Sequence, residues 1–213
     1  MKTLVLGTNN KKKGIELAEL LSPYRIEVKT LADFDKKLDV TEDGKTFLEN
    51  ARKKASEQAA FLNAWVIGED SGLCVNALDG APGIYSARFA SLSDGLDCSG
   101  QDFSGKNASD GANNQRLLEL LNDTAWEKRT AHYTCAAVLS DPSGTIRGES
   151  EGCCRGIIRF EPSGSGGFGY DPLFEIAEYH RTFGEISAAI KRTISHRAGA
   201  IRKLMPHILA AYA

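Results

Sequence analysis

The chain has 213 residues, of which 42% are hydrophobic and 25% charged, and its formal net charge is −2. This length suits a large domain with a substantial core, whereas the near-neutral charge excludes a general attraction to nucleic acid or to anionic membranes. No apolar run approaches the roughly 20 residues that span a bilayer, so we expect neither a nucleic-acid nor a membrane partner. Any phosphate ligand must be bound by local side chains.

The N-terminal run at 2–7 (KTLVLG) predicts a strand covered on both faces, and it is too short for a signal peptide. A polar loop with three lysines, residues 8–14, leads into a predicted helix whose apolar side carries Ile15, Ala18 and Leu21. Such a loop is a natural anion site because backbone N–H groups and the helix dipole point into it. A bound anion and a solvated lysine cluster both fit this pattern.

A second strand is predicted at 25–30, followed by a turn at 41–45. Thr46 and Glu49 have the spacing of a capping box, which gives Glu49 a structural role at a helix start. Glu42 precedes this cap, in a turn that can present its carboxylate to a cleft. The predicted apolar face of the helix carries Phe47, Ala51, Ala55, Ala59 and Leu62.

Two adjacent acids follow the apolar strand at 65–67, in the sequence Gly68-Glu69-Asp70-Ser71-Gly72. We expect the glycines to form a tight turn at the end of the strand. There the carboxylates could bind a hard cation, take a proton from water, or cap the next element. An acidic hairpin turn without further function fits these five residues equally well.

The middle of the chain combines turns, helices and a pair of strands. We predict a turn at 80–83, a short helix at 85–89, a mobile surface loop at 91–111, a helix at 112–121, and paired strands at 130–139 and 145–153.

The stretch at 164–172 (GSGGFGYDP) has four glycines within six residues. Close approach of the backbone to a ligand would explain them, with Phe168 and Tyr170 offering ring faces to a planar group; a flexible loop is the alternative. Near the C-terminus, Ser195 can cap a last helix. Arg197 would then lie in its first turn, where a cation opposes the dipole unless an acceptor faces it.

The five cysteines are odd in number and form neither a CxxC motif nor a zinc-ligand spacing. We therefore expect reduced, mostly buried thiols in a cytoplasmic protein. A catalytic thiol would need a charged neighbourhood, and the apolar strand around Cys135 argues against one.

Five motifs follow one another in the order that one enzyme family has. They are T-N-N-x-x-K at 8–13, E-D-G-x-T-F-x-E-N-A at 42–51, E-D-S-G-L with G-A-P-G-I-Y-S-A-R at 69–88, G-G-F-G-Y-D-P at 166–172, and K-x-x-x-S-H-R at 191–197. With them, the chain resembles the inosine triphosphate pyrophosphatase family over almost its whole length. Each motif alone is modest evidence, whereas five in register are very specific.

The resemblance implies an α/β fold, with one ITPase-like domain over residues 1–213. Its long curved mixed β-sheet would be flanked by helices, with two lobes and a central cleft. It also implies a reaction, the Mg²⁺-dependent hydrolysis of ITP, dITP and XTP to the nucleoside monophosphate and pyrophosphate. Such an enzyme removes non-standard purine nucleotides from the nucleotide pool. A homodimer is implied as well.

The resemblance further assigns roles to residues that match its motifs. The residues expected to act in catalysis are Asp70, Lys13, Glu42 and Glu69, with Glu42 and Asp70 binding the metal and Asp70 serving as the base. The expected contacts to the nucleotide outside the base pocket are Thr8, Asn9, Asn10, Lys11, Lys12, Lys13, Lys54, Ser71 and Arg88. The expected base pocket consists of Phe168, Gly169, Tyr170, Asp171, Lys191, His196 and Arg197.

The chemistry of these residue types suits the implied reaction. Mg²⁺ takes hard oxygen ligands and keeps some of its waters, and attack of water on phosphorus needs positioning and charge neutralisation. Donors in the base pocket would favour the C6 carbonyl of hypoxanthine and xanthine over the amine of adenine. Two features depart from the family: Glu69 stands where many relatives have Asp, and the 91–111 loop is longer than expected.

Three other interpretations remain. A Maf-type pyrophosphatase would share the fold but act on other nucleotides, and the motifs at 166–172 and 195–197 argue against it. A nucleotide-binding regulator without catalysis is disfavoured by the intact set of Glu42, Asp70 and Lys13. A nucleic-acid-binding module is disfavoured by the charge balance and the missing basic stripe.

Overall fold

The protein is described by a computed structural model that covers residues 2–92 and 107–212, so most of the predicted loop at 91–111 lies outside the described residues. The strands of the described part form a seven-stranded sheet in the order β2-β1-β3-β4-β5-β6-β7. They are β1 (Lys2–Leu6), β2 (Ile26–Thr30), β3 (Val66–Val75), β4 (Thr130–Ser140), β5 (Ile146–Ile158), β6 (Phe174–Ile176) and β7 (Arg181–Thr182). The helices are α1 (Lys11–Leu21), α2 (Phe47–Leu62), α3 (Asp110–Leu120), α4 (Ala188–Ile194) and α5 (His196–Ala210).

The sheet is mixed, which confirms the predicted α/β class. β1 pairs in parallel with β2 and β3, whereas β6 is antiparallel to both β5 and β7. None of the described helices is long and apolar enough to cross a membrane.

The chain divides into two compact units. Unit 1 comprises Met1–Ser71, Cys135–Cys153 and Ser195–Ala213, and unit 2 comprises Gly72–Thr134 and Cys154–Ile194. The strands β3, β4 and β5 each contribute residues to both units. The predicted pair of lobes with a central cleft stays a prediction.

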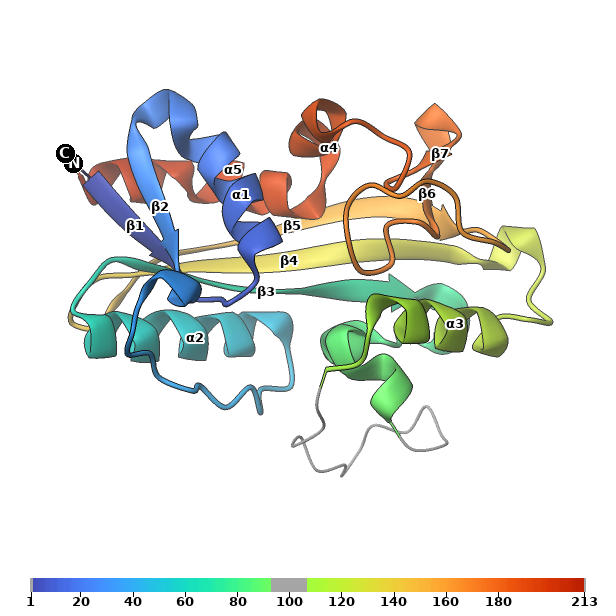
Figure 1. The fold of residues 1–213 in the computed structure, drawn as a ribbon, viewed down its shortest axis with the longest axis horizontal. Helices are drawn as coiled ribbons and strands as arrows, with labels where there is room; N and C mark the ends of the chain where they lie inside the picture. Colours follow the sequence, from blue (N-terminus) through green and yellow to red (C-terminus); the bar gives the residue numbers. More distant parts are fainter. Residues whose placement is uncertain (1, 93–106, 213) are drawn as a thin grey trace. The chain divides into compact units, whose positions relative to one another are not determined.

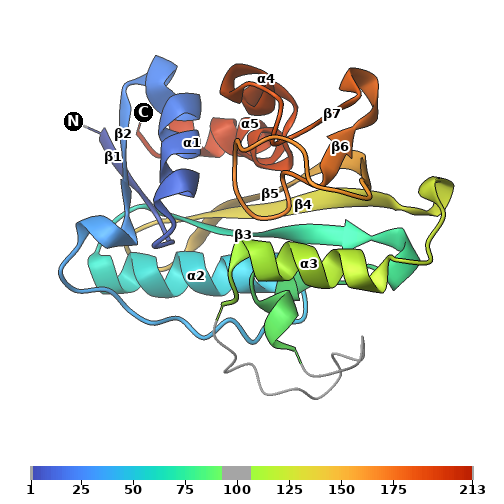
Figure 2. The same cartoon turned by 45° about the vertical axis from the view of Figure 1, so that its right-hand side comes forward.

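In unit 1, α2 covers one face of the strands, and α1 and α5 cover the other (Figures 1 and 2). Ile67 of β3 packs in one cluster with Leu17 of α1 and Ile201 of α5. Its neighbour Val66 packs instead with Ala59 of α2. Because successive side chains of a strand point to opposite faces, the odd-numbered residues of this part of β3 face α1 and α5, and the even-numbered ones face α2.

The predicted turn at Gly68–Gly72 is wrong, because β3 runs straight through it. The small size of Gly68 serves helix packing instead. A Cβ at this position would lie 2.1 Å from the Ala51 carbonyl oxygen and 2.4 Å from the Ala55 nitrogen of α2. Glu69 and Asp70 therefore lie inside a strand, where their side chains must point to opposite faces.

The first helix begins earlier than its apolar pattern indicates. The Asn10 side chain caps α1 by accepting hydrogen bonds from the backbone nitrogens of Lys12 (3.0 Å) and Lys13 (3.3 Å). The core side of α1 carries Leu17, whereas Ile15 is 59% exposed. The prediction for Ile15 is wrong because residues two apart lie on nearly opposite sides of a helix.

In unit 2, α3 lies on one face of the strands and α4 on the other (Figures 1 and 2). The core is aromatic, with Tyr133 and Phe174 rings whose centroids are 4.6 Å apart. Buried Arg129 donates to the carbonyl oxygens of Leu121 (2.7 Å) and Ile158 (2.8 Å). The short elements β6, β7 and α4 were not predicted, because they are too short to show a periodic pattern.

Candidate active site

Asp70 lies on the face of β3 that α2 covers, where a lysine joins it to a second carboxylate. Lys54 Nζ donates to Asp70 Oδ1 at 3.0 Å and to Glu42 Oε2 at 2.9 Å. The Glu42 side chain is 42% exposed and that of Asp70 is 12% exposed. The structure thus brings together the two predicted metal ligands and a lysine predicted to contact the nucleotide.

Asn50 connects the parts of this cluster, although its position in the sequence predicted no functional role. Its Nδ2 donates to Asp70 Oδ2 at 3.2 Å, and its Oδ1 accepts from the Gly44 nitrogen at 2.8 Å. The second bond fixes the segment that carries Glu42. Asn50 precedes Lys54 by four residues, a spacing that places both on one face of α2. This spacing is the sequence signal that could have identified Asn50 as a member of the site.

The surroundings shift the acidity of this cluster. Burial raises the pKa of Asp70, the charge of Glu42 raises it further, and Lys54 opposes both. Burial alone would lower the pKa of Lys54, but Asp70 and Glu42 raise it on balance. Lys54 is therefore a charged ammonium, and Asp70 is a more basic carboxylate than an exposed aspartate.

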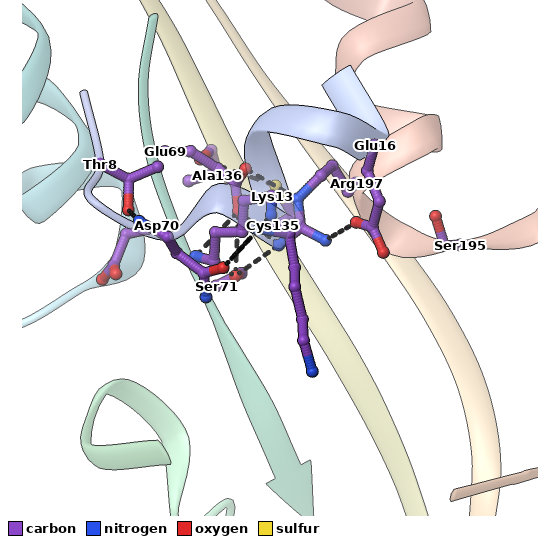
Figure 3. Close-up of polar contacts among 12 residues, drawn as sticks. Thr8, Lys13, Glu16, Glu69, Asp70, Ser71, Cys135, Ala136, Ser195 and Arg197 are labelled. Carbon is purple, nitrogen blue, oxygen red and sulfur yellow. Dashed lines mark hydrogen bonds and ion pairs between the residues drawn. The ribbon is translucent and has the colours of Figure 1, made fainter. Parts of the chain in front are cut away.

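Glu69 lies on the opposite face of β3, where donors occupy both of its oxygens (Figure 3). Arg197 binds it in a bidentate manner, with Nε 2.7 Å from Oε2 and Nη2 2.7 Å from Oε1. Oε1 also lies 3.2 Å from Lys13 Nζ and accepts from Ser71 Oγ at 3.1 Å. The guanidinium additionally binds Glu16, a residue that the sequence analysis did not single out although it lies one turn from Lys13.

This second cluster is a buried ion network. Burial alone would raise the pKa of Glu69, but Arg197 and Lys13 hold it well below its ordinary value. Burial alone would lower the pKa of Arg197, and the carboxylates raise it well above its ordinary value. Glu69 is thus an acceptor that faces the cation in the first turn of α5, and the adjacent His196 is buried as well.

The predicted phosphate loop lies at the N-terminus of α1 in the same unit. Thr8 is half-buried, and its Oγ1 accepts from the Asn10 nitrogen at 3.2 Å. Asn9, Lys11 and Lys12 are exposed. Lys13 reaches the Glu69 carboxylate of β3, with its Nζ 3.2 Å from Oε1 and also 3.2 Å from Ser71 Oγ.

In unit 2, the glycine-rich loop wraps around Asp171. Lys191 Nζ donates to Asp171 Oδ2 at 2.7 Å and lies 4.8 Å from the centroid of the Phe168 ring. The same oxygen accepts from the Phe168 nitrogen at 2.8 Å. Gly167 has φ +75°, and a Cβ there would lie 2.0 Å from this oxygen. The glycine is explained by this close approach, and three predicted base-pocket residues lie together.

Gly169 and Tyr170, the next two residues of the glycine-rich loop, are held by hydrogen bonds to α3 and to Ser86. The Gly169 nitrogen donates to Asp110 Oδ2 at 2.8 Å, and its carbonyl accepts from Asn114 Nδ2 at 3.1 Å. Tyr170 is buried and its hydroxyl donates to the Ser86 carbonyl at 2.9 Å. No sequence signal identified Asp110 or Asn114, because their contacts are made across more than 50 residues of chain.

Arg88, a predicted contact to the nucleotide, and Cys135, a thiol not expected to be catalytic, both lie among the described residues. Arg88 lies in a 3₁₀ segment, Gly83–Ser91, with its guanidinium 5.6 Å from the centroid of the Tyr85 ring. Burial raises the pKa of Cys135 well above its ordinary value, and the nearby charge of Glu69 adds to this effect. A protonated thiol is a poor nucleophile, which agrees with the exclusion of thiol chemistry.

The predicted metal ligands can be tested against their surroundings. The described residues contain no group of three or more His, Cys, Asp or Glu that could hold a metal ion. Mg²⁺ is commonly held by one or two carboxylates together with waters and substrate phosphates, so Glu42 and Asp70 fit it as a pair. Glu69 does not fit, because its oxygens are already occupied by Arg197, Lys13 and Ser71.

Comparisons with known proteins identify similar chains. The model of the Ham1 family matches residues 4–207. A dITP/XTP pyrophosphatase of Rhodopirellula baltica is 48% identical over 206 residues, which cover 97% of this chain and 92% of the relative. The solved HAM1 protein of Coxiella burnetii is 33% identical with a TM-score of 0.81, and each chain is covered completely. The Staphylococcus aureus Ham1 protein is 34% identical with a TM-score of 0.78, covering 99% and 100% of the two chains.

Proposed function

The chain belongs to the Ham1 family, and we propose that it hydrolyses ITP, dITP and XTP to the nucleoside monophosphate and pyrophosphate with Mg²⁺. The observation that carries the proposal is the cluster of Asp70, Lys54 and Glu42 on one face of β3. It combines a basic carboxylate, a hard-cation ligand pair and an ammonium that can bind phosphate. The relatives named as dITP/XTP pyrophosphatases support the choice of substrate.

Asp70 acts as the base in this proposal. Its carboxylate accepts a proton from the attacking water, and in the metal-free protein burial and the charge of Glu42 raise its pKa, which makes it more basic than an exposed aspartate. Asn50 fixes its orientation through Oδ2. Bound Mg²⁺, held by Glu42 and Asp70, would supply charge neutralisation at the phosphates.

Lysines neutralise the remaining charge on the triphosphate. Lys13 is presented in the first turn of α1, where the helix dipole also favours an anion. Lys54 is held at the carboxylates by its buried stem. Thr8, Asn9, Asn10, Lys11, Lys12, Ser71 and Arg88 keep their assignment as further contacts to the nucleotide.

Base recognition is assigned to the cluster around Asp171. Lys191 can donate to the C6 carbonyl of hypoxanthine or xanthine, whereas the amine of adenine offers it no acceptor. Asp171 and the backbone turn hold the lysine and the Phe168 ring in a fixed relation. Gly169 and Tyr170 of the same loop complete the set of residues proposed for the base. Arg197 is left out because its guanidinium nitrogens already bind Glu69, Glu16 and Ser71, and the adjacent His196 is buried in the same unit 1.

A substrate panel tests the proposal. Purified protein is incubated with ITP, XTP, dITP, GTP, ATP and dTTP in the presence of Mg²⁺, and pyrophosphate and orthophosphate are quantified separately. We expect pyrophosphate from ITP, dITP and XTP and little product from ATP and dTTP. Guanine shares the C6 carbonyl, so the product from GTP measures how strongly its 2-amino group is rejected. Orthophosphate as the direct product would refute the reaction type, preference for dTTP would favour a Maf-type enzyme, and tight ITP binding without turnover would favour a regulator.

The proposal extends to assembly and location. The family resemblance supports a homodimer in the cytoplasm, without nucleic-acid or membrane partners. Sedimentation of the purified protein at several concentrations measures the assembly directly. A mass near 46 kDa, twice the 23.0 kDa of the chain, is the expected result.

A further inference from the structure

The ammonium of Lys54 occupies the position between the two carboxylates that are proposed to bind the metal. It lies 2.9 Å from an oxygen of Glu42 and 3.0 Å from an oxygen of Asp70. A Mg²⁺ ion binds carboxylate oxygens at about 2.0–2.1 Å. An ion bound to these same two oxygens would lie next to the ammonium, and the two cations would repel each other.

The backbone around Lys54 is closely packed and hydrogen-bonded. Helix α2 packs so closely on β3 that a Cβ at Gly68 would lie 2.1 Å from the Ala51 carbonyl oxygen. Asp70 is fixed by Asn50, and the segment of Glu42 is fixed through Gly44. Because α2 and β3 are in close contact here, exchange of the ammonium for a metal ion requires movement of side chains, and the ammonium of Lys54 is the group that must leave the carboxylate oxygens.

We propose that Lys54 is a built-in counter-ion and a positioning residue of the metal site, which makes metal binding depend on the nucleotide. The inference rests on the proposed function. Without nucleotide, the ammonium neutralises one of the two carboxylate charges and keeps the affinity for divalent cations low. A triphosphate offers the ammonium several anionic oxygens, so Lys54 moves to the phosphates and leaves the carboxylates to the metal.

The charge count supports this order of events. Glu42, Asp70 and Lys54 together carry a net charge of −1, whereas the two carboxylates alone carry −2. A substitution that removes the ammonium should therefore tighten metal binding. A merely structural role of Lys54 predicts the reverse, since loss of a structural contact disorders the ligands.

The test is a titration of the nucleotide-free protein with Mg²⁺ alone, in which calorimetry measures the binding affinity. We expect Lys54→Met to bind Mg²⁺ at least about tenfold more tightly than the unmodified protein, which corresponds to about 1.4 kcal/mol. The matched control is Lys53→Met. This neighbouring lysine pairs with Asp43 at the surface, so its loss removes the same charge without freeing the metal ligands, and it should change the affinity less than about twofold.

Thermal unfolding gives a second readout, because a ligand of the folded state raises the melting temperature. Mg²⁺ should raise the melting temperature of Lys54→Met and of Lys54→Gln, and barely change that of the unmodified protein. The glutamine variant replaces the methionine variant if the latter fails to fold.

Two results would overturn the inference. One is Mg²⁺ binding by the folded Lys54 variants that is unchanged or weaker. The other is tight Mg²⁺ binding by the nucleotide-free unmodified protein, which requires no variant. Neither result concerns the proposed function, which stands or falls separately with pyrophosphate release from ITP by the unmodified protein.

Discussion

Glu69 and Asp70 are neighbours in the chain, yet their carboxylates lie in different chemical surroundings on the two faces of β3. On the α1 and α5 face, the Glu69 side chain is 1% exposed and bound by Arg197, Lys13 and Ser71. On the α2 face, Asp70 keeps 12% exposure and shares a lysine with the half-exposed Glu42. The pKa of Glu69 is lowered and that of Asp70 is raised.

The difference shows how a strand separates the roles of adjacent acids. Alternation along the strand gives each side chain its own helix and its own cation. A carboxylate whose oxygens are occupied by a guanidinium and an ammonium can organise those cations. A carboxylate with fewer donors and a raised pKa can bind a metal or accept a proton. The following predictions test this division.

The largest effect is expected for Asp70→Asn. Turnover of ITP should fall about 10³-fold, because the amide cannot accept the proton from water, while the melting temperature should stay close to that of the unmodified protein. Pyrophosphate release and thermal unfolding measure the two quantities. Asp43→Asn, which changes an exposed acid beside Glu42, serves as the control. Near-normal turnover by Asp70→Asn would refute its role as the base.

Glu69→Gln should mainly cost stability. Loss of one partner leaves Arg197 buried without its full complement of charge, which typically costs about 3–5 kcal/mol. Chemical denaturation measures the free energy of unfolding. Glu16→Gln is the matched control: it removes the other carboxylate bound to Arg197, at a more exposed position, and should cost about 1 kcal/mol or less. Equal effects of both substitutions would contradict the central place of Glu69 in the network.

Lys13→Ala should raise the KM for ITP about tenfold, within the range expected for the loss of one charge-assisted hydrogen bond. Lys128→Ala is the control, because this lysine is exposed and has no assigned contact to the nucleotide. Steady-state kinetics with both variants measure the difference. Unchanged KM and kcat for Lys13→Ala would show that this lysine serves only the Glu69 network.

The raised pKa of Asp70 predicts the pH dependence of the reaction. The base must be deprotonated, so kcat/KM falls as the pH falls through the pKa of Asp70 in the folded protein. Burial and Glu42 raise that pKa in the metal-free protein, whereas Mg²⁺ bound to the carboxylate would lower it, so the acid limb should move to lower pH as the Mg²⁺ concentration rises. pH–rate profiles with ITP at several Mg²⁺ concentrations measure this movement. An acid limb that does not move with Mg²⁺ would contradict the assignment of Asp70 as a metal-binding base.

Much of the fold could be predicted from periodicity and capping. The apolar stripe of α2 and the cap of α5 by Ser195 are confirmed, because local pattern and tertiary packing agree there. The turn at Gly68–Gly72 was predicted wrongly, since a glycine required by helix packing has the same appearance in sequence as a glycine required by a turn. The reason for Gly68 lies in α2, a contact that no local pattern shows.

The sequence predicted which residues belong to the candidate site better than it predicted the contacts between them. The motifs identified Glu42, Asp70 and Lys54, and the structure brings all three together. They did not show that Glu69 is saturated by Arg197, because these residues are 128 positions apart in the chain. Long-range ion pairs of this kind form because α5 packs against the strands. No local sequence pattern predicts this packing, because it joins segments that are far apart in the chain.

The most direct test of the division between the two acids is the Mg²⁺ concentration that gives half-maximal ITP hydrolysis by Glu69→Gln, measured below the melting temperature of the variant. If Glu69 organises Lys13 and Arg197 and does not bind metal, this concentration stays within about threefold of that for the unmodified protein, less than the tenfold change that 1.4 kcal/mol would give. A rise of tenfold or more would make Glu69 a metal ligand and contradict the account.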